Sequence, residues 1–179
     1  MDFPAQRMPR EIFGYLSTIN SDLGSANLLS NTAFNAAAAW PTANKAIYCP
    51  VLVDRVITVT QMAVVNGATV NGNLDLGIYD EAGNKVVSKG STAQSGTNAV
   101  QALDITDTEL KPGLYFLALA SSSGTATFFR ANGASTEVTR VCGLQQQTSA
   151  FALPSTATFA NPSQNYSPLI YASYRSSVV

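Results

Sequence analysis

The sequence of 179 residues contains no histidine, only two cysteines and few charged residues. The absence of histidine excludes Ser-His-Asp and Cys-His nucleophilic sites and removes the commonest general base near neutral pH. It also excludes most zinc sites, because two isolated cysteines cannot supply a set of four thiolates. We therefore predict that the protein is not an enzyme and that it holds no cofactor or metal.

Basic residues are also scarce, with ten lysines and arginines against eleven acidic residues, and they form no cluster. Because nucleic-acid binding needs several cations on one face, we expect no nucleic-acid partner. No window approaches the roughly 20 apolar residues of a membrane span, so we expect no membrane insertion. The N-terminal stretch MDFPAQRMPREIFGYL lacks the apolar region of a secretory signal, so we expect synthesis in the cytoplasm.

The two cysteines, Cys49 and Cys142, lie far apart in the apolar segments IYCPVLV and VTRVCGL. Both suit small buried hydrophobic positions. A disulfide between them stays open as an alternative, although the missing secretory signal points away from an oxidising compartment.

Paired carboxylates are the remaining route to hydrolysis, particularly of glycosides. The candidates are Asp75, Asp80, Glu81, Asp104, Asp107 and Glu109. Aspartates that stabilise turns explain most of them, because we place Asp80 and Glu81 in a tight turn and the last three in a short connection, ITDTEL. Calcium binding by Asp104 with Asp107 or Asp80 is a second alternative, without the spacing of an EF-hand loop.

Short apolar strands separated by turns dominate the chain between residues 55 and 130. Turn residues recur every 8–12 positions or so, which is typical of an antiparallel sandwich or barrel. We predict that RVITVTQMAVV and LYFLALA are central strands and that Pro50 marks an edge or bulge in KAIYCPVLV. NLDLGIYD alternates as a half-buried strand does, whereas EAGN, NGATVNGN and SSSG are predicted to close hairpins.

The chain divides into an N-terminal arm and one β-sandwich domain. Residues 1–40 are predicted to form a docking arm, either a short amphipathic helix or an extended segment on a neighbour. Residues 41–179 form the sandwich, with its core in 41–130 and a looser part in 131–179 that ends in a closing strand, LIYASYR. The expected fold is therefore all-β, an antiparallel and jelly-roll-like sandwich.

Apolar and aromatic side chains outside the predicted core are candidates for contacts between molecules. Our candidates for an interface between subunits are Phe13, Leu16, Leu28, Leu29, Trp40, Tyr171 and Tyr174. A sugar-binding platform is the alternative, formed by Phe151, Phe159 and Tyr166 around a shallow groove. Few charges would have to be desolvated when such surfaces are buried, because charged residues make up only 12% of the chain.

One segment carries a resemblance to a known family. It begins with AWPTANKAIYCP and continues through TVTQM, NGATVNGN, GIYDEAGNKV and GSTAQSG to PGLYFLAL. This series, over about residues 39–130, resembles a β-sandwich domain of structural proteins in tailed bacteriophages. The resemblance rests on turn and core positions, so it implies a fold and a setting and carries no catalytic residues.

The resemblance implies a virion protein made in the host cytoplasm. We expect a homo-oligomer, with a trimer as the first hypothesis, that contacts other virion proteins on the capsid or tail surface. The alternative is an adhesin that binds a glycan of the host surface.

Overall fold

Two long strands, β3 (Lys45–Val53) and β9 (Gly113–Ser121), form the centre of the larger sheet. In this computed structural model, which describes residues 11–14, 36–131 and 135–176, the two strands pair over their whole length. On its other side β9 pairs with β5 (Asn73–Asp80), so LYFLALA is the central strand that we predicted. The sheet has six strands in the order β11 (Gln145–Gln147), β3, β9, β5 and β6 (Lys85–Ser88), with β7 (Thr92–Ala93) also paired to β5.

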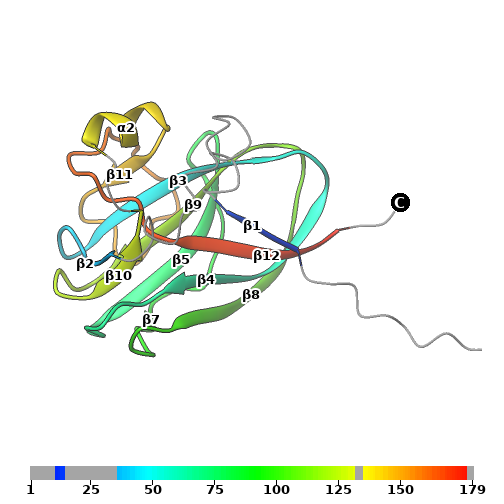
Figure 1. Cartoon of the computed structure of the whole chain (residues 1–179). Helices are drawn as coiled ribbons and strands as arrows, with labels where there is room; N and C mark the ends of the chain where they lie inside the picture. Colours follow the sequence, from blue (N-terminus) through cyan, green and yellow to red (C-terminus); the bar gives the residue numbers. More distant parts are fainter. Residues whose placement is uncertain (1–10, 15–35, 132–134, 177–179) are drawn as a thin grey trace, which may run out of the picture.

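A second sheet of four strands packs against the first. Its order is β1 (Glu11–Gly14), β12 (Ile170–Ser176), β4 (Ile57–Val65) and β8 (Val100–Leu110), all antiparallel. The predicted central strand is therefore confirmed as β4, and the predicted closing strand as β12. Figure 1 shows β12 and β4, which pair side by side in this sheet.

Together these sheets confirm an all-β antiparallel sandwich. The chain changes sheet between β3 and β4, between β4 and β5, and between β8 and β9, as the crossing connections of Greek-key and jelly-roll sandwiches do. Pro50 fits this arrangement, because β11 pairs with β3 only over Ala46–Tyr48 and leaves the Pro50 position without a described strand on that side. Proline lacks the N–H that such a neighbour would require.

Two of the predicted hairpins are wrong. NGATVNGN carries the chain from β4 in one sheet to β5 in the other, and it packs on β10 (Thr127–Arg130), where Gly67 donates its N–H to the Thr127 carbonyl at 2.8 Å. SSSG does not fold β10 back onto β9. Instead β10 pairs with β2 (Ala36–Ala39) in a separate small sheet. In both places the apolar faces of successive segments reach the core only if the chain crosses over.

The hairpin predicted at EAGN is confirmed. It joins β5 to β6, and Gly83 adopts the positive φ of 85° that such a turn requires. Both carboxylate oxygens of Asp80 accept hydrogen bonds from Asn84, one from the main-chain N–H at 2.7 Å and one from the side-chain amide at 3.0 Å. The side chain thus fixes the turn that follows it.

The placement of ITDTEL in a short connection is also wrong. These residues continue β8 to Leu110; Leu103 and Ile105 alternate as buried positions, and Leu110 is buried again after a register shift in the pairing with β4. Asp104, Asp107 and Glu109 consequently lie exposed along a strand and not in a turn. The period of two was present in the sequence, but the aspartates concealed it because they are rare in strands.

A six-residue helix, α2 (Thr136–Val141), was not predicted in the looser C-terminal part. Ser135 caps it, since its hydroxyl accepts the N–H of Val138 at 3.2 Å. Glu137 lies in the first turn and Arg140 in the last, where each charge favours the helix dipole. So short a helix contains too few residues to show a clear apolar period.

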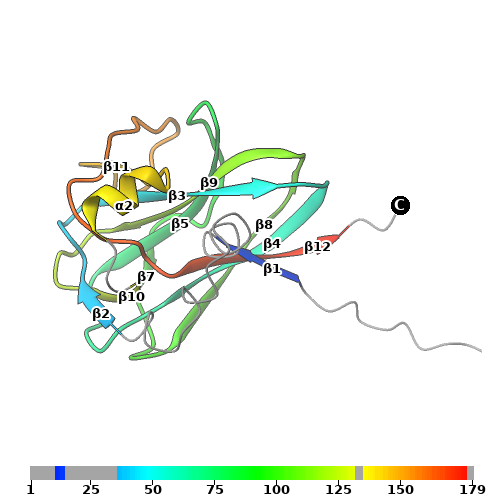
Figure 2. The ribbon, with the colours of Figure 1, turned by 45° about the horizontal axis from the view of Figure 1, so that its top comes forward.

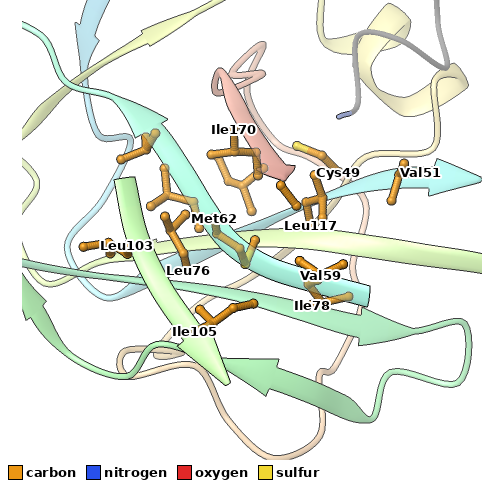
Figure 3. Close-up of a cluster of buried hydrophobic side chains, with 14 of the residues drawn as sticks. Cys49, Val51, Val59, Met62, Leu76, Ile78, Leu103, Ile105, Leu117 and Ile170 are labelled. Carbon is orange, nitrogen blue, oxygen red and sulfur yellow. The ribbon is translucent and has the colours of Figure 1, made fainter. Parts of the chain in front are cut away.

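The main core fills the space between the two sheets. Figure 3 shows Met62, Leu103 and Ile105 of the four-stranded sheet meeting Leu76, Ile78 and Leu117 of the larger one. Cys49 also lies here and is fully buried, as predicted. Burial of these apolar side chains supplies the main driving force for folding. Each fully buried Val, Leu, Ile or Met side chain contributes about 1.5–3 kcal/mol.

A second buried cluster covers the outer face of the larger sheet. It consists of Ala46, Tyr48, Tyr79, Phe116, Ala118, Ala120, Ala150 and Leu153, with Phe151 and Phe159 packed against it. The segment 148–160 therefore covers this face, and β5 is buried on both sides. The half-buried alternation predicted for NLDLGIYD is thus wrong, because Asp75, Gly77 and Tyr79 do not face solvent.

Only part of the N-terminal region is described. Residues 11–14 form the strand β1 and pair with β12, so this stretch is extended and not helical. Residues 36–39 form β2. Leu16, Leu28 and Leu29 lie outside the described residues.

Candidate interaction surface

Trp40 lies in the core and offers no surface to a partner. Its exposed fraction is 1%, and its ring lies edge-on to Phe128 and Tyr166 at centroid distances of 5.4 and 5.3 Å. The indole Nε1 donates to the carbonyl of Lys45 at 3.0 Å. An interface role for Trp40 therefore does not fit, because tertiary packing places it between β2, β10 and the C-terminal segment.

The three candidates for sugar binding are not brought together. Tyr166 is buried beside Trp40 in the main core, and its hydroxyl donates to the carbonyl of Ala38 at 2.8 Å. Phe159 packs on Phe116 and Tyr48 in the second cluster, and Phe151 is half-buried against that cluster. Tyr166 belongs to the main core and the two phenylalanines to the second cluster, so the three rings form no common platform.

Tyr174 and Tyr171 lie on the same strand but face opposite sides of it. Tyr174 is buried in the core, where its hydroxyl accepts a hydrogen bond from Arg55 at 2.9 Å. Tyr171 is half-buried, and burial raises the pKa of its phenol above the ordinary value. Phe13 lies at the position of β1 opposite Ala172. Of the candidates with described side chains, Tyr171 is thus the one that suits an outward contact.

The strand register shows which side chains accompany Tyr171. Tyr171 lies opposite Ala63, and Ala63 lies opposite Ala102 on β8. The next positions along, Ala172, Met62 and Leu103, are core residues, so the first three must point outward because successive side chains alternate. Val65 and Val100 form the next outward pair. We call Tyr171, Ala63, Ala102, Val65 and Val100 the outer strip.

The outer strip is apolar and partly open to solvent. Val100 is 56% exposed and Ala102 is also exposed, Tyr171 and Val65 are half-buried, and Ala63 is buried at 5% exposure. The next outward positions are Ser173, Gln61 and Asp104, which form a polar margin on the same face. An apolar centre beside a polar margin is the usual composition of a contact surface between proteins.

The exposed edge of β8 borders this face. In the described residues β8 pairs only with β4, and Asp104, Asp107 and Glu109 are exposed along it. Like charges on an edge strand disfavour pairing with an identical edge. The edge therefore favours contacts through the face of the sheet over growth of the sheet from β8.

Asp80 and Glu81 do not form a pair suited to acid–base chemistry. Asp80 and Glu81 lie in an open depression of about 450 Å³ with Tyr115 and Leu114, but the hydrogen bonds from Asn84 lower the pKa of Asp80. A general acid needs the opposite shift. Among the described residues no group of three or more His, Cys, Asp or Glu side chains could hold a metal ion.

The burial of two ionisable side chains, Asp75 and Lys45, was not predicted from the sequence. Burial raises the pKa of Asp75, which is 1% exposed and accepts hydrogen bonds from the main-chain N–H groups of Gly90 (2.8 Å) and Leu153 (3.1 Å). Burial lowers the pKa of Lys45, whose Nζ donates to Gln146 at 3.3 Å. The cavity beside Lys45 has a volume of about 10 Å³. That is room for about one water, so Lys45 has no space for a substrate.

The two cysteines are free thiols. Cys49 is fully buried, and burial raises its pKa far above the ordinary value, which makes the reactive thiolate scarce. Cys142 is half-buried and packs against the main core.

No family model, no curated protein and no solved structure matches this chain. The resemblance to bacteriophage structural proteins therefore stays a prediction from the residues. In the part of the chain that the structure describes, no helix is long and apolar enough to cross a membrane.

Proposed function

We propose that the protein is a non-enzymatic structural component of a bacteriophage virion, on the capsid or tail surface, that assembles with copies of itself. The outer strip is the observation that supports this proposal most directly. It presents exposed Val100 and Ala102 beside half-buried Tyr171 on one face of the four-stranded sheet. A second copy can cover such a face without burying an unpaired charge, because the charged residues lie at its margin.

The low charge of the whole chain supports the same proposal. Charged residues make up 12% of the sequence, about half of the usual share of ~25%. Surfaces of this kind repel identical copies weakly, so close packing of many copies costs little. A decoration or tail-associated protein, present in many copies on one particle, needs this property. A trimer is the first arrangement that we would test.

The experiment is to measure the oligomeric state by light scattering during gel filtration. Val100→Lys adds a charge to the outer strip at its most exposed position, which tolerates the change without loss of folding. Leu52→Lys is the matched control, because Leu52 is 61% exposed but lies on β3 of the opposite sheet. We expect the wild type and the Leu52 variant to be oligomers and the Val100 variant to be a monomer.

A wild-type protein that stays monomeric at high concentration would refute the proposal. The virion setting has its own test, which is whether peptides of this chain occur at constant stoichiometry in purified particles. Glycan-array binding by the isolated protein would instead favour the adhesin. No arrangement of Phe151, Phe159 and Tyr166 supports that alternative, because their rings are packed in two separate clusters.

A further inference from the structure

The strand β1 has only four residues and forms one edge of the four-stranded sheet. It pairs with β12 over four positions, with Glu11 opposite Tyr174 and Gly14 opposite Tyr171. β12 is longer than β1, since it continues to Ser176 beyond the paired stretch. Both views show β1 alongside β12 at the margin of the four-stranded sheet (Figures 1 and 2). The β12 edge is thus a site for an added strand, and β1 fills part of it.

The connection between β1 and the body of the sandwich is long. β1 ends at Gly14 and the next described strand, β2, begins at Ala36. Residues 15–35 could span about 70 Å if extended, at roughly 3.3 Å per residue. Among the described strands β1 pairs only with β12. The length of this connection therefore permits β1 to reach the same edge on another molecule.

The β12 edge also borders the outer strip. Gly14 of β1 lies directly opposite Tyr171, which belongs to the outer strip. Because each outer strip borders its own β12 edge, a contact between the outer strips of two copies would place both edges at the margin of the interface. In such a contact β1 of one copy is tethered near the neighbour's edge, which raises its effective concentration there.

We propose that β1 of one copy pairs with β12 of a second copy in the assembled protein. The exchanged form makes the same main-chain hydrogen bonds as the closed one, so it costs no pairing energy. The exchange also joins two copies by main-chain hydrogen bonds between strands, in addition to the contact between their outer strips. This inference rests on the proposed function, because it needs copies that are already close together.

The test uses two chains that carry different tags and are co-expressed. One carries Ile12→Cys and the other carries Ser173→Cys, two positions that lie opposite each other in the register. Neighbouring antiparallel positions have Cα atoms about 4.5–5.5 Å apart, within the range of a disulfide. A disulfide between the two tagged chains forms only if β1 of one lies on β12 of the other. We expect this product on a non-reducing gel and in peptide mapping.

The matched control pairs Ile12→Cys with Gln61→Cys. Gln61 lies opposite Ser173 on β4, one strand further from β1, and should give no link. Phe13→Cys with Ala172→Cys is a second pair at the neighbouring register position, in case the first pair impairs folding. A chain that carries both Ile12→Cys and Ser173→Cys reports the closed form as a link within one molecule.

The outcomes separate the two proposals. Disulfides between the differently tagged chains support the exchange. An oligomer by light scattering whose disulfides form only within the doubly substituted chain refutes the exchange and leaves the proposed function intact. A monomer that forms only internal disulfides refutes both.

Discussion

The indole Nε1 of Trp40 donates a hydrogen bond to the main-chain carbonyl of Lys45, at 3.0 Å, inside the core. The bond joins the end of β2 to the start of β3, and the ring fills the space between Phe128 and Tyr166. Trp40 is the single tryptophan of the chain. One side chain therefore both packs the core and satisfies a buried carbonyl.

Replacing Trp40 tests this double role. We expect Trp40→Ala to lower the free energy of unfolding by about 3–5 kcal/mol, because it leaves a large cavity. Trp40→Phe should cost less, about 1–3 kcal/mol, chiefly because the Lys45 carbonyl loses its donor. Urea unfolding followed by circular dichroism measures both. Leu52→Ala, at a site that is 61% exposed, is the control and should change stability by only about 0.5 kcal/mol.

The crossing after β4 depends on the lack of a side chain at Gly67. A Cβ there would lie 2.5 Å from the Thr127 hydroxyl and 2.7 Å from the Cβ of Ala37. We expect Gly67→Ala to destabilise the protein by about 1–3 kcal/mol through overpacking. Thermal unfolding measures the loss. Gly113→Ala is the control, since its nearest neighbour would be 3.7 Å away. Equal stability of the two variants would contradict the proposed clash.

A buried group of side-chain amides joins β4, β8 and the segment that follows β7. Asn66 donates to the side chain of Gln101 at 2.9 Å and to the carbonyl of Ser95, and it accepts from Gln94 at 3.0 Å. We expect a double-mutant cycle of Asn66→Ala and Gln101→Ala to give a coupling of about 0.5–3 kcal/mol. Asn71→Ala removes side-chain hydrogen bonds at an exposed site, so it should lower the free energy of unfolding less than Asn66→Ala does. Simple additivity of the two core substitutions would rule out the network.

The buried carboxylate of Asp75 predicts a pH dependence. Burial raises its pKa in the folded state, so the folded protein holds this proton more tightly than the unfolded chain does. The stability contribution of Asp75 is thus fully present below the ordinary carboxyl pKa of about 4 and falls as the pH rises through the folded value.

Urea unfolding of the wild type and Asp75→Asn between acidic and neutral pH tests this sign. The stability of the wild type relative to the variant should fall with rising pH across that window. Asp104→Asn, on the exposed edge of β8, serves as the surface control. A relative stability that rises with pH would mean that the hydrogen bonds from Gly90 and Leu153 outweigh burial.

The thiols should differ sharply in reactivity. Cys49 is fully buried with a raised pKa, so we expect iodoacetamide to modify it only when the protein unfolds. Cys142 is half-buried and should react first. Intact mass and peptide mapping over time measure the order. Rapid labelling of Cys49 under native conditions would show that the β3 region opens readily.

Local chemistry explains which features could be predicted from the sequence. The hairpin at Asp80–Asn84 depends on neighbours within five residues, and the strands β3, β4, β9 and β12 are long enough for their composition to be decisive. The crossing at NGATVNGN has the same turn residues as a hairpin. Whether such a turn closes a hairpin or changes sheet depends on which core the next strand must reach, and no local pattern records that.

The candidate contact residues show the same division. The sequence alone does not show whether an aromatic residue fills a core or contacts a partner. Packing against distant segments buries Trp40 and Tyr166 and half-buries Phe159. Tyr171 was already an interface candidate from the sequence, but its neighbours on the same face, Ala63 and Ala102, became known only from the strand register. The outer strip combines three strands that are far apart in the chain, so its existence could not be inferred from one segment.

The amino-acid sequence alone determined the class of fold, since strand composition and turn residues act over a few positions and need no distant partner. It also removed histidine-dependent chemistry outright. The tertiary structure decided which aromatic rings are buried, which sheet each strand joins and which apolar side chains remain on the surface. Those outcomes depend on contacts between residues separated by 50–130 positions or so, and only the packed chain brings such residues together.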